Sequence, residues 1–185
     1  MSIAQDLFFS QQALLRLFAV TNKLQMQGDR YLQDLTIRQM LAIPAIIHAP
    51  EGGASIADIA RSLGTSKQSA KQIVNVLEKK GYIATAPGKQ DKRALDITIT
   101  SEGERAFKLC SERTDEFLAD IFNGFTSREL ETFCKLLEKL YRFDGQSQHD
   151  IAAGADSSIS SDTDEASILQ HHQHYIDRRT TNRDK

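Results

Sequence analysis

A change of hydrophobic period after Gly81 constrains the fold of this chain more than any other feature. Before it, "SIADIARSLGTSKQSAKQIVNVLEKK" has apolar residues at helical spacing, first from Ser55 to Gly64 and then from Ser66 to Lys80. After it, "YIATA" and "ALDITIT" alternate apolar and polar residues around "PGKQDKR", which is typical of a β-hairpin. A short helix, a turn, a longer helix and a hairpin in this order predict a winged helix-turn-helix.

The sequence on both sides of this motif is predicted to be helical. Apolar residues recur near helical spacing over residues 3–26, with Gly28 as the expected break, and again over 102–123 and 127–143. Pro44 lies inside the helix before the motif and is expected to kink it or end it early. These helices carry more apolar side chains than a small winged domain covers, which predicts a homodimer. A self-contained helical bundle is the alternative.

Helix starts are indicated by four matches to the capping box. In this motif a hydroxyl accepts a hydrogen bond from the backbone N–H three residues on, and the side chain there reaches back. The matches are Thr36–Gln39, Thr65–Gln68, Ser101–Glu104 and Thr126–Glu129. Each precedes a helical pattern, and Ser55 is expected to cap the short helix in the same way.

These patterns divide the chain into four regions of a mainly α protein with a two-stranded β wing. They are an N-terminal dimerisation region (1–34), the winged helix-turn-helix domain (35–100), C-terminal dimerisation helices (101–143) and a polar, acidic tail (144–185). The tail is low in aromatic residues, so its composition predicts disorder. We therefore expect it to be dispensable for folding and dimerisation.

Positive charge is concentrated in the predicted winged domain. The whole chain has a formal net charge of -2, yet the segment from Arg61 to Arg93 holds eight lysines and arginines against Glu78 and Asp91. Clustering of one sign in such a chain indicates a polyanionic partner for this segment. A solvated helix face is the alternative, because it has the same composition.

The helix 66–80 is predicted to lie in the major groove of DNA. Its apolar residues are expected to face the core, while the opposite side of its N-terminal half is polar or basic. The predicted DNA-contacting residues are Ser66, Lys67, Gln68, Ser69, Lys71 and Gln72. Glutamine can pair with adenine and lysine with guanine. Gln68 presents a conflict, because it cannot close a capping box with Thr65 and read a base at the same time.

The hairpin tip is predicted to contact the minor groove. It supplies Lys89, Lys92 and Arg93, and a guanidinium on a narrow loop can enter a minor groove or grip its rim. Asp91 is expected to brace Arg93 or to hold the shape of the tip. An ordinary solvent loop is the alternative.

Three segments carry a resemblance to a known family: "LTIRQMLAI", "SIADIARSLGTSKQSAKQIVNVLEKKGYI" and "DKRALDITITSEGE". They resemble the multiple-antibiotic-resistance regulator (MarR) family of bacterial transcription factors over about residues 35–110. The resemblance implies a homodimer with intertwined terminal helices, a pseudo-palindromic double-stranded DNA operator and Arg93 in the minor groove. It also leaves room for a small-molecule effector, whose identity nothing in the sequence selects. Pro44 and the tail depart from the family pattern.

The expected function is therefore a sequence-specific DNA-binding transcriptional regulator that acts as a repressor. The alternative is a winged-helix protein-interaction module that does not bind DNA, and the basic segment argues against it. The sequence contains no nucleophile elbow, phosphate loop or HExxH motif, so neither an enzyme nor a cofactor is expected. It also lacks a signal peptide and an apolar run of the length that spans a bilayer, so a cytoplasmic protein is expected.

Histidine and cysteine give no sign of a site. His48 lies at a predicted helix end and is expected to be a cap or a surface residue. The tail contains His171, His172 and His174, but no acid or cysteine is spaced to complete a site, so no metal is expected. The two cysteines, Cys110 and Cys134, lie on helical apolar stripes and are predicted to be buried.

Overall fold

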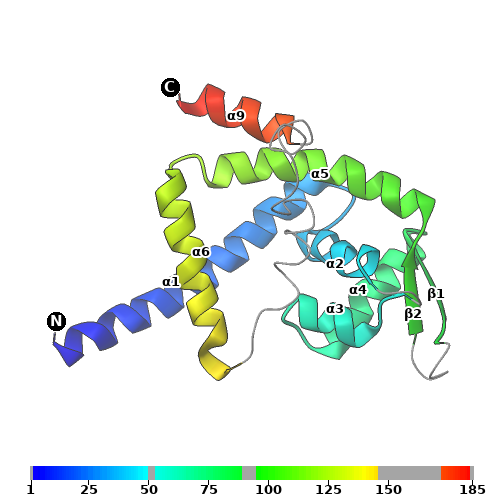
Figure 1. Cartoon of the computed structure of the whole chain (residues 1–185), viewed down its shortest axis with the longest axis horizontal. Helices are drawn as coiled ribbons and strands as arrows, with labels where there is room; N and C mark the ends of the chain where they lie inside the picture. Colours follow the sequence, from blue (N-terminus) through cyan, green and yellow to red (C-terminus); the bar gives the residue numbers. More distant parts are fainter. Residues whose placement is uncertain (1, 50–52, 89–94, 146–171, 184–185) are drawn as a thin grey trace.

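The structure is a computed structural model that describes residues 2–49, 53–88, 95–145 and 172–183 (Figure 1). The N-terminal and winged-helix elements are α1 (Ile3–Leu32), α2 (Ile37–Ile47), α3 (Ile56–Ser62), α4 (Lys67–Lys79), β1 (Ile83–Pro87) and β2 (Leu95–Ile99). They are followed by α5 (Ser101–Ile121), α6 (Ser127–Tyr141), a 3-10 turn (Arg142–Asp144) and α9 (Gln173–Arg183). This order confirms the predicted mainly helical fold with a two-stranded wing.

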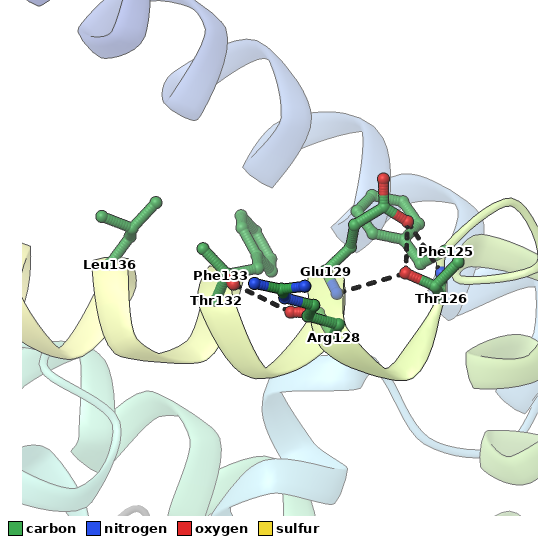
Figure 2. A pocket seen from close by; sticks show the side chains of 7 residues that line it. All are labelled: Phe125, Thr126, Arg128, Glu129, Thr132, Phe133 and Leu136. Atoms are coloured by element: carbon green, nitrogen blue, oxygen red, sulfur yellow. Dashed lines mark hydrogen bonds between the residues drawn. The ribbon is translucent and has the colours of Figure 1, made fainter.

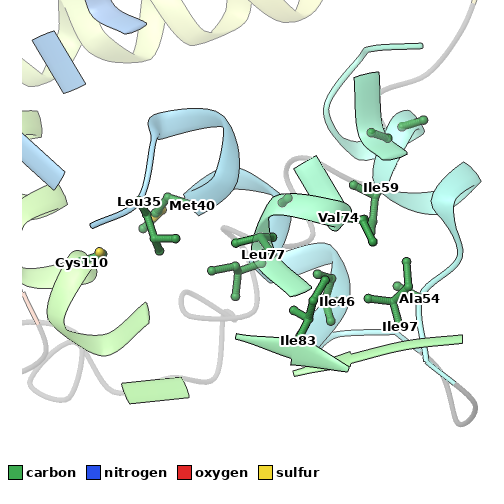
Figure 3. Close-up of a cluster of buried hydrophobic side chains, with 14 of the residues drawn as sticks. Leu35, Met40, Ile46, Ala54, Ile59, Val74, Leu77, Ile83, Ile97 and Cys110 are labelled. Carbon is green, nitrogen blue, oxygen red and sulfur yellow. The ribbon is translucent and has the colours of Figure 1, made fainter. Parts of the chain in front are cut away.

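One apolar core holds the winged helix together. Ile59 of α3, Val74 and Leu77 of α4, and Ile97 of β2 are all buried in it (Figure 3). The two strands pair antiparallel, with Ile83 opposite Ile99 at one end of the ladder and Pro87 opposite Leu95 at the other. Ala54, just before α3, adds a short bridge to the sheet through two backbone hydrogen bonds of 2.9 Å with Ile97. The hairpin is therefore anchored to the same core that orients α4.

Helix α1 continues through Gly28, so the predicted break at this residue is wrong. Gly28 is buried in the helix, and a Cβ added to it would lie 2.1 Å from Cγ1 of Ile37 and 3.3 Å from Cε1 of Phe117. The glycine thus lets α1 approach α2 and α5 closely. The helix instead ends at Leu32, and its C-cap is Gln33, a non-glycine residue with a φ of 60°.

Two of the four predicted capping boxes form, and at the other two helices a neighbouring residue is the cap and no capping box forms. Thr36 and Thr126 cap as predicted, and Ser55 caps α3 with Asp58 as its partner. Helix α4 is capped by Ser66 instead of Thr65, and α5 by Thr100 instead of Ser101. The shift at α5 has a tertiary cause, because the Thr100 hydroxyl also donates to the Gly81 carbonyl, 2.7 Å away.

Pro44 does not end its helix early. Helix α2 continues three residues beyond it, to Ile47, and the N–H of His48 donates to the carbonyl oxygen of Pro44. Proline removes only one backbone hydrogen bond, while the neighbouring Ile43 and Ile46 are buried in the core. Packing therefore holds the helix together across the proline. His48 is the exposed C-cap residue, as predicted.

The helices α1 and α6 present wide apolar surfaces to solvent. Only Gly28 and Leu32 are buried among the thirty residues of α1, whereas Leu14 is 57% and Phe18 64% exposed. Helix α6 has no buried residue, and its Leu136 is 59% exposed. Figure 1 shows α1 projecting away from the winged helix as a long arm.

The two cysteines differ in environment. Cys110 is fully buried, as predicted, and burial raises the pKa of its thiol. Cys134 lies on α6 and is exposed, so the prediction that it is buried is wrong for the single chain. The apolar stripe on which it was placed is real, but it has no partner surface in the described residues.

The end of the tail differs from the predicted disorder. Residues 173–183 form α9, which lies along α5 (Figure 1). Arg178 makes two hydrogen bonds to Asp120 of α5, of 2.6 and 2.7 Å. His172, just before α9, contacts the carboxylate of Asp115 at 2.9 and 3.0 Å. The composition of the tail indicated disorder because it is polar, but here polar and charged side chains supply the docking contacts.

Candidate nucleic-acid interface

Helix α4 divides into a buried apolar face and an exposed polar face. Ala70, Val74 and Leu77 are buried, which confirms the predicted core side of the helix. Of the six residues predicted to contact DNA from this helix, Ser66, Lys67, Gln68, Lys71 and Gln72 are exposed and Ser69 is half-buried. Packing of the apolar face against the core thus orients the polar face toward solvent.

Gln68 does not close a capping box at the start of α4, the role that would have competed with reading a base. Ser66 accepts a hydrogen bond from the Ser69 N–H at 3.2 Å, and its hydroxyl also donates to the Ser69 hydroxyl at 3.1 Å. Ser66 and Ser69 therefore shape the helix start, whereas Gln68 is exposed and takes no part in the cap. The conflict expected from a capping box between Thr65 and Gln68 does not arise.

The basic segment does not form a single surface. Lys80 turns away from the exposed side of α4, since its ammonium donates to the Asp34 carbonyl and to Oε1 of Gln39, the latter at 3.3 Å. Arg61 forms an ion pair with Asp58 at 3.0 Å within α3. Among the α4 cations predicted to contact DNA, Lys67 and Lys71 remain on the exposed face.

The carboxyl of Asp58 also stabilises the start of α3. Burial raises the pKa of Asp58, but hydrogen bonds from the Ser55 side chain and backbone and from Arg61 outweigh it and lower the pKa overall. The ionised form of Asp58 is therefore favoured, which strengthens the first turn of the helix that supports α4.

The predicted wing contacts lie outside the described residues. This applies to Lys89, Lys92 and Arg93 and to the predicted brace, Asp91. The strands that lead into and out of the tip are paired up to Pro87 and Leu95. The four assignments at the tip remain predictions.

Arg38 is a cation beside α4 that the sequence reasoning did not single out. It is exposed in the first turn of α2, and its Nη2 donates to the Thr65 hydroxyl at 2.9 Å. Together with Ser69 and Gln72 it lines a groove of about 250 Å³ between α2 and α4. The capping box at Thr36 places Arg38 in a first helical turn, but its proximity to α4 depends on the tertiary structure.

No other class of site is evident in the described part of the chain. Within residues 2–49, 53–88, 95–145 and 172–183, no three histidines, cysteines or acids are grouped so that they could hold a metal ion. The helices in these ranges also include none with the length and apolar character needed to cross a bilayer.

The fold and the exposed face of α4 define a winged helix-turn-helix protein. Residues 33–94 match the sequence profile of the MarR family. This match covers the winged helix, so residues 33–94 form a winged-helix domain of the MarR family.

Similar proteins agree with this assignment. The chain is 26% identical over 161 residues to the transcriptional activatory protein BadR of Rhodopseudomonas palustris. This match covers 83% of this chain and 89% of BadR. The crystal structure of the S. aureus MepR-DNA complex matches with a TM-score of 0.61 and 21% identity, over 70% of this chain and 95% of that one. PcaV of Streptomyces coelicolor, in complex with its natural ligand, matches with a TM-score of 0.59 and 17% identity, over 68% and 91% of the two chains.

Proposed function

We propose that this protein is a homodimeric, sequence-specific DNA-binding regulator that inserts α4 into the major groove. The observation that carries the proposal is the division of α4. Its apolar side is locked into the core, while Lys67, Gln68, Lys71 and Gln72 form an exposed face. Lysine and glutamine at the start of such a helix are suited to base edges and phosphates. MepR, which shares the fold, has been crystallised with DNA.

The wing supplies the second contact in this proposal. Lys89, Lys92 and Arg93 enter or border the minor groove, with Asp91 holding Arg93 in place. The support is the sequence of the tip and the anchoring of both strands to the core beside α4.

The apolar surfaces of α1 and α6 support a homodimer. A groove of about 480 Å³ at the start of α6 is lined by Phe125, Phe133 and Leu136, with Arg128 and Glu129 at its polar side (Figure 2). Exposed apolar area of this extent is rare on monomers and marks an interface. A two-fold dimer buries the same helices of both copies and presents two α4 helices to a pseudo-palindromic operator.

The mode of regulation is also part of the proposal. A dimer that occupies an operator represses by blocking access to the DNA, and we propose repression for this protein, although its relative BadR is an activator. The site of action is the cytoplasm, where bacterial DNA lies. The proposal also leaves room for a small-molecule effector, since PcaV, which shares the fold, has been crystallised with its natural ligand.

A salt series tests DNA binding directly. The probe is a duplex selected by the protein from a random pool, and its affinity is measured by fluorescence anisotropy at increasing salt. If each protomer neutralises several phosphates, log K falls by about 0.9 per phosphate for each unit of log salt. The double variant Lys67→Gln/Lys71→Gln should make the slope of log K against log salt less steep, because it removes two charges that are proposed to neutralise phosphates.

The matched control removes the same charge far from α4, in the double variant Lys108→Gln/Lys139→Gln on α5 and α6. This control should keep the slope of the unmodified protein. Failure to select any duplex, or a response to salt that is flat from the start, would instead support the winged-helix protein-interaction module.

A further inference from the structure

The groove between α2 and α4 carries a cation on the side of α4 that is proposed to face DNA. Arg38 lines this groove on the α2 side, with Thr36 and Gln39, and the α4 side is lined by Ser69, Gln72, Ile73 and Val76. Gln72 is one of the side chains proposed to read bases, so the Arg38 guanidinium lies next to the proposed reading face. The groove is shallow, with a volume of about 250 Å³, and suits an anionic group better than a whole ligand.

The hydrogen bond to Thr65 orients Arg38 without neutralising it. Nη2 of Arg38 donates to the Thr65 hydroxyl at 2.9 Å, and Thr65 directly precedes the cap of α4. An arginine has five N–H donors, so one bond to a neutral hydroxyl leaves most of them available. Within the described residues, no carboxylate lies within salt-bridge distance of Arg38.

Two neighbouring cations are, by contrast, engaged by other groups of the protein. Lys80 is engaged by Asp34 and Gln39, and Arg61 by Asp58. Arg38 is exposed, no carboxylate among the described residues pairs with its charge, and its guanidinium is held by Thr65, the residue before the cap of α4. Arginine in such a setting binds phosphate through two parallel N–H groups.

We propose that Arg38 binds a backbone phosphate of the DNA strand that borders the major groove, and that Thr65 holds its guanidinium in position for this contact. The inference rests on the proposed function, and it adds a contact from α2 to those already proposed for α4 and the wing. A phosphate bound by Arg38 fixes the position of α4 along the major groove of the DNA, because Arg38 is hydrogen-bonded to Thr65, the residue before the α4 cap. Arg38 thus sets the register of α4 without reading sequence.

The test uses the full-length protein and four variants. Arg38→Gln removes the charge, Arg38→Lys keeps the charge without the paired N–H groups, and Thr65→Val removes the hydroxyl. Lys108→Gln, which removes an exposed charge from α5, is the matched control. Affinity is measured by fluorescence anisotropy on a duplex selected from a random pool and on a duplex of scrambled order, each over a series of salt concentrations.

We expect Arg38→Gln to weaken binding to both duplexes by about tenfold, because a charge-assisted hydrogen bond is lost. The slope of log K against log salt should fall by about 0.9 for each protomer that contacts DNA. Arg38→Lys should keep the slope and lose part of the affinity. Thr65→Val should also keep the slope, because the charge remains, and weaken binding severalfold. Lys108→Gln should bind as the unmodified protein does.

Two results would overturn the proposal. An unchanged salt slope in Arg38→Gln would show that Arg38 only braces α2 against α4, since a structural role does not change the number of phosphates neutralised. A loss confined to the selected duplex would show that Arg38 reads a base. Circular dichroism checks whether Arg38→Gln folds. If it does not, Arg38→Lys and Thr65→Val test the phosphate contact in its place. Unchanged DNA affinity in both variants would refute that contact. Failure of the unmodified protein to bind any duplex would refute the proposed function instead.

Discussion

Single hydroxyl groups decide where the helices of the winged domain begin. Ser55, Ser66 and Thr100 each accept a hydrogen bond from the backbone N–H three residues on. Their positions set where each helix begins and which residues fall in its first turn. With Ser66 as the cap, Gln68 is exposed in the first turn of α4 and free to contact DNA.

At the same scale, the change Asp58→Asn should destabilise the fold in a pH-dependent way. The pKa of Asp58 lies below its ordinary value of 3.8, so its ionised form stabilises the folded state above that pH. This stabilisation is lost as the pH falls through the folded pKa. Because the Asp58 side chain is 46% exposed, we expect a loss of only about 0.5–1 kcal/mol at neutral pH.

Urea unfolding of both proteins between neutral and strongly acidic pH measures this difference. The gap between them should close on acidification, since both residues are then uncharged. Glu102→Gln, which breaks an exposed ion pair with Arg105, is the control. A gap that stays constant with pH would mean that the charge of Asp58 does not stabilise α3.

Gln72 and Arg93 should differ in what they contribute to DNA binding. Gln72→Ala removes an exposed amide that is proposed to pair with a base, which should cost about 1–3 kcal/mol on the selected duplex and much less on scrambled DNA. Arg93→Ala removes a cation proposed for the minor groove, so binding to both duplexes should weaken alike. Two binding isotherms per variant at fixed salt separate the two roles. Equal weakening by Gln72→Ala would mean that α4 does not read bases through this residue.

At the scale of elements, α9 joins three parts of the helical scaffold. Arg178 binds Asp120 of α5, and the same carboxylate accepts a hydrogen bond from the Tyr31 hydroxyl of α1. This bond to Asp120, together with burial, raises the pKa of Tyr31. Arg179 is buried and donates to the Phe125 carbonyl, 2.6 Å away, at the corner between α5 and α6. The C-terminal helix therefore contacts α5 and the corner between α5 and α6.

Removing one of these contacts should loosen α9 without unfolding the winged domain. The core cluster contains no residue of α9, so the winged domain should stay folded in Arg178→Ala. The change should cost only about 1 kcal/mol, because the Arg178 side chain is 41% exposed and solvent screens its ion pair with Asp120. Urea unfolding measures the stability, and limited proteolysis measures the release of α9. The control Arg142→Ala breaks an exposed pair with Glu138 within the C-terminal part of the α6 region and should have a smaller effect. Equal protease resistance of Arg178→Ala and the unmodified protein would show that the ion pair does not hold α9.

At the scale of the whole molecule, the exposed apolar arms require a partner surface. Leu14, Phe18, Leu136 and Leu140 are all more than half exposed, on helices that extend from the winged domain. Burying such residues releases roughly 25 cal/mol for each Å² of apolar area removed from water. A second copy of the chain supplies matching surfaces, because both arms are present in each protomer.

Deletion of residues 1–26 should therefore abolish the dimer. The deletion removes the exposed apolar part of α1 but keeps Gly28 and Leu32, which pack against the rest of the chain. Sedimentation measures the association, and circular dichroism confirms folding. A chain that ends at Phe143 is the control and should remain dimeric, because it keeps α1 and α6. A stable, folded dimer without residues 1–26 would place the interface elsewhere.

The sequence by itself determined the order of elements in the winged helix and the two faces of α4. Both follow from short-range patterns, since a helical or strand period and a cap depend on residues only a few positions apart. It also predicted the amphipathic arms, which the exposed α1 and α6 confirm. The failures at Gly28, Thr65 and Ser101 have a common reason, because each rule for breaking or capping a helix was applied without the residue's tertiary contacts.

Only the tertiary structure decided the features that depend on residues far apart in the chain. Gly28 continues a helix because Ile37 and Phe117 lie against it, and Thr100 caps α5 because its hydroxyl also donates a hydrogen bond to the Gly81 carbonyl. Arg38 reaches Thr65, and Arg178 reaches Asp120, across 27 and 58 residues. The physical reason is that such contacts form between groups that folding brings together, and no local period or composition encodes which distant side chain will be the partner.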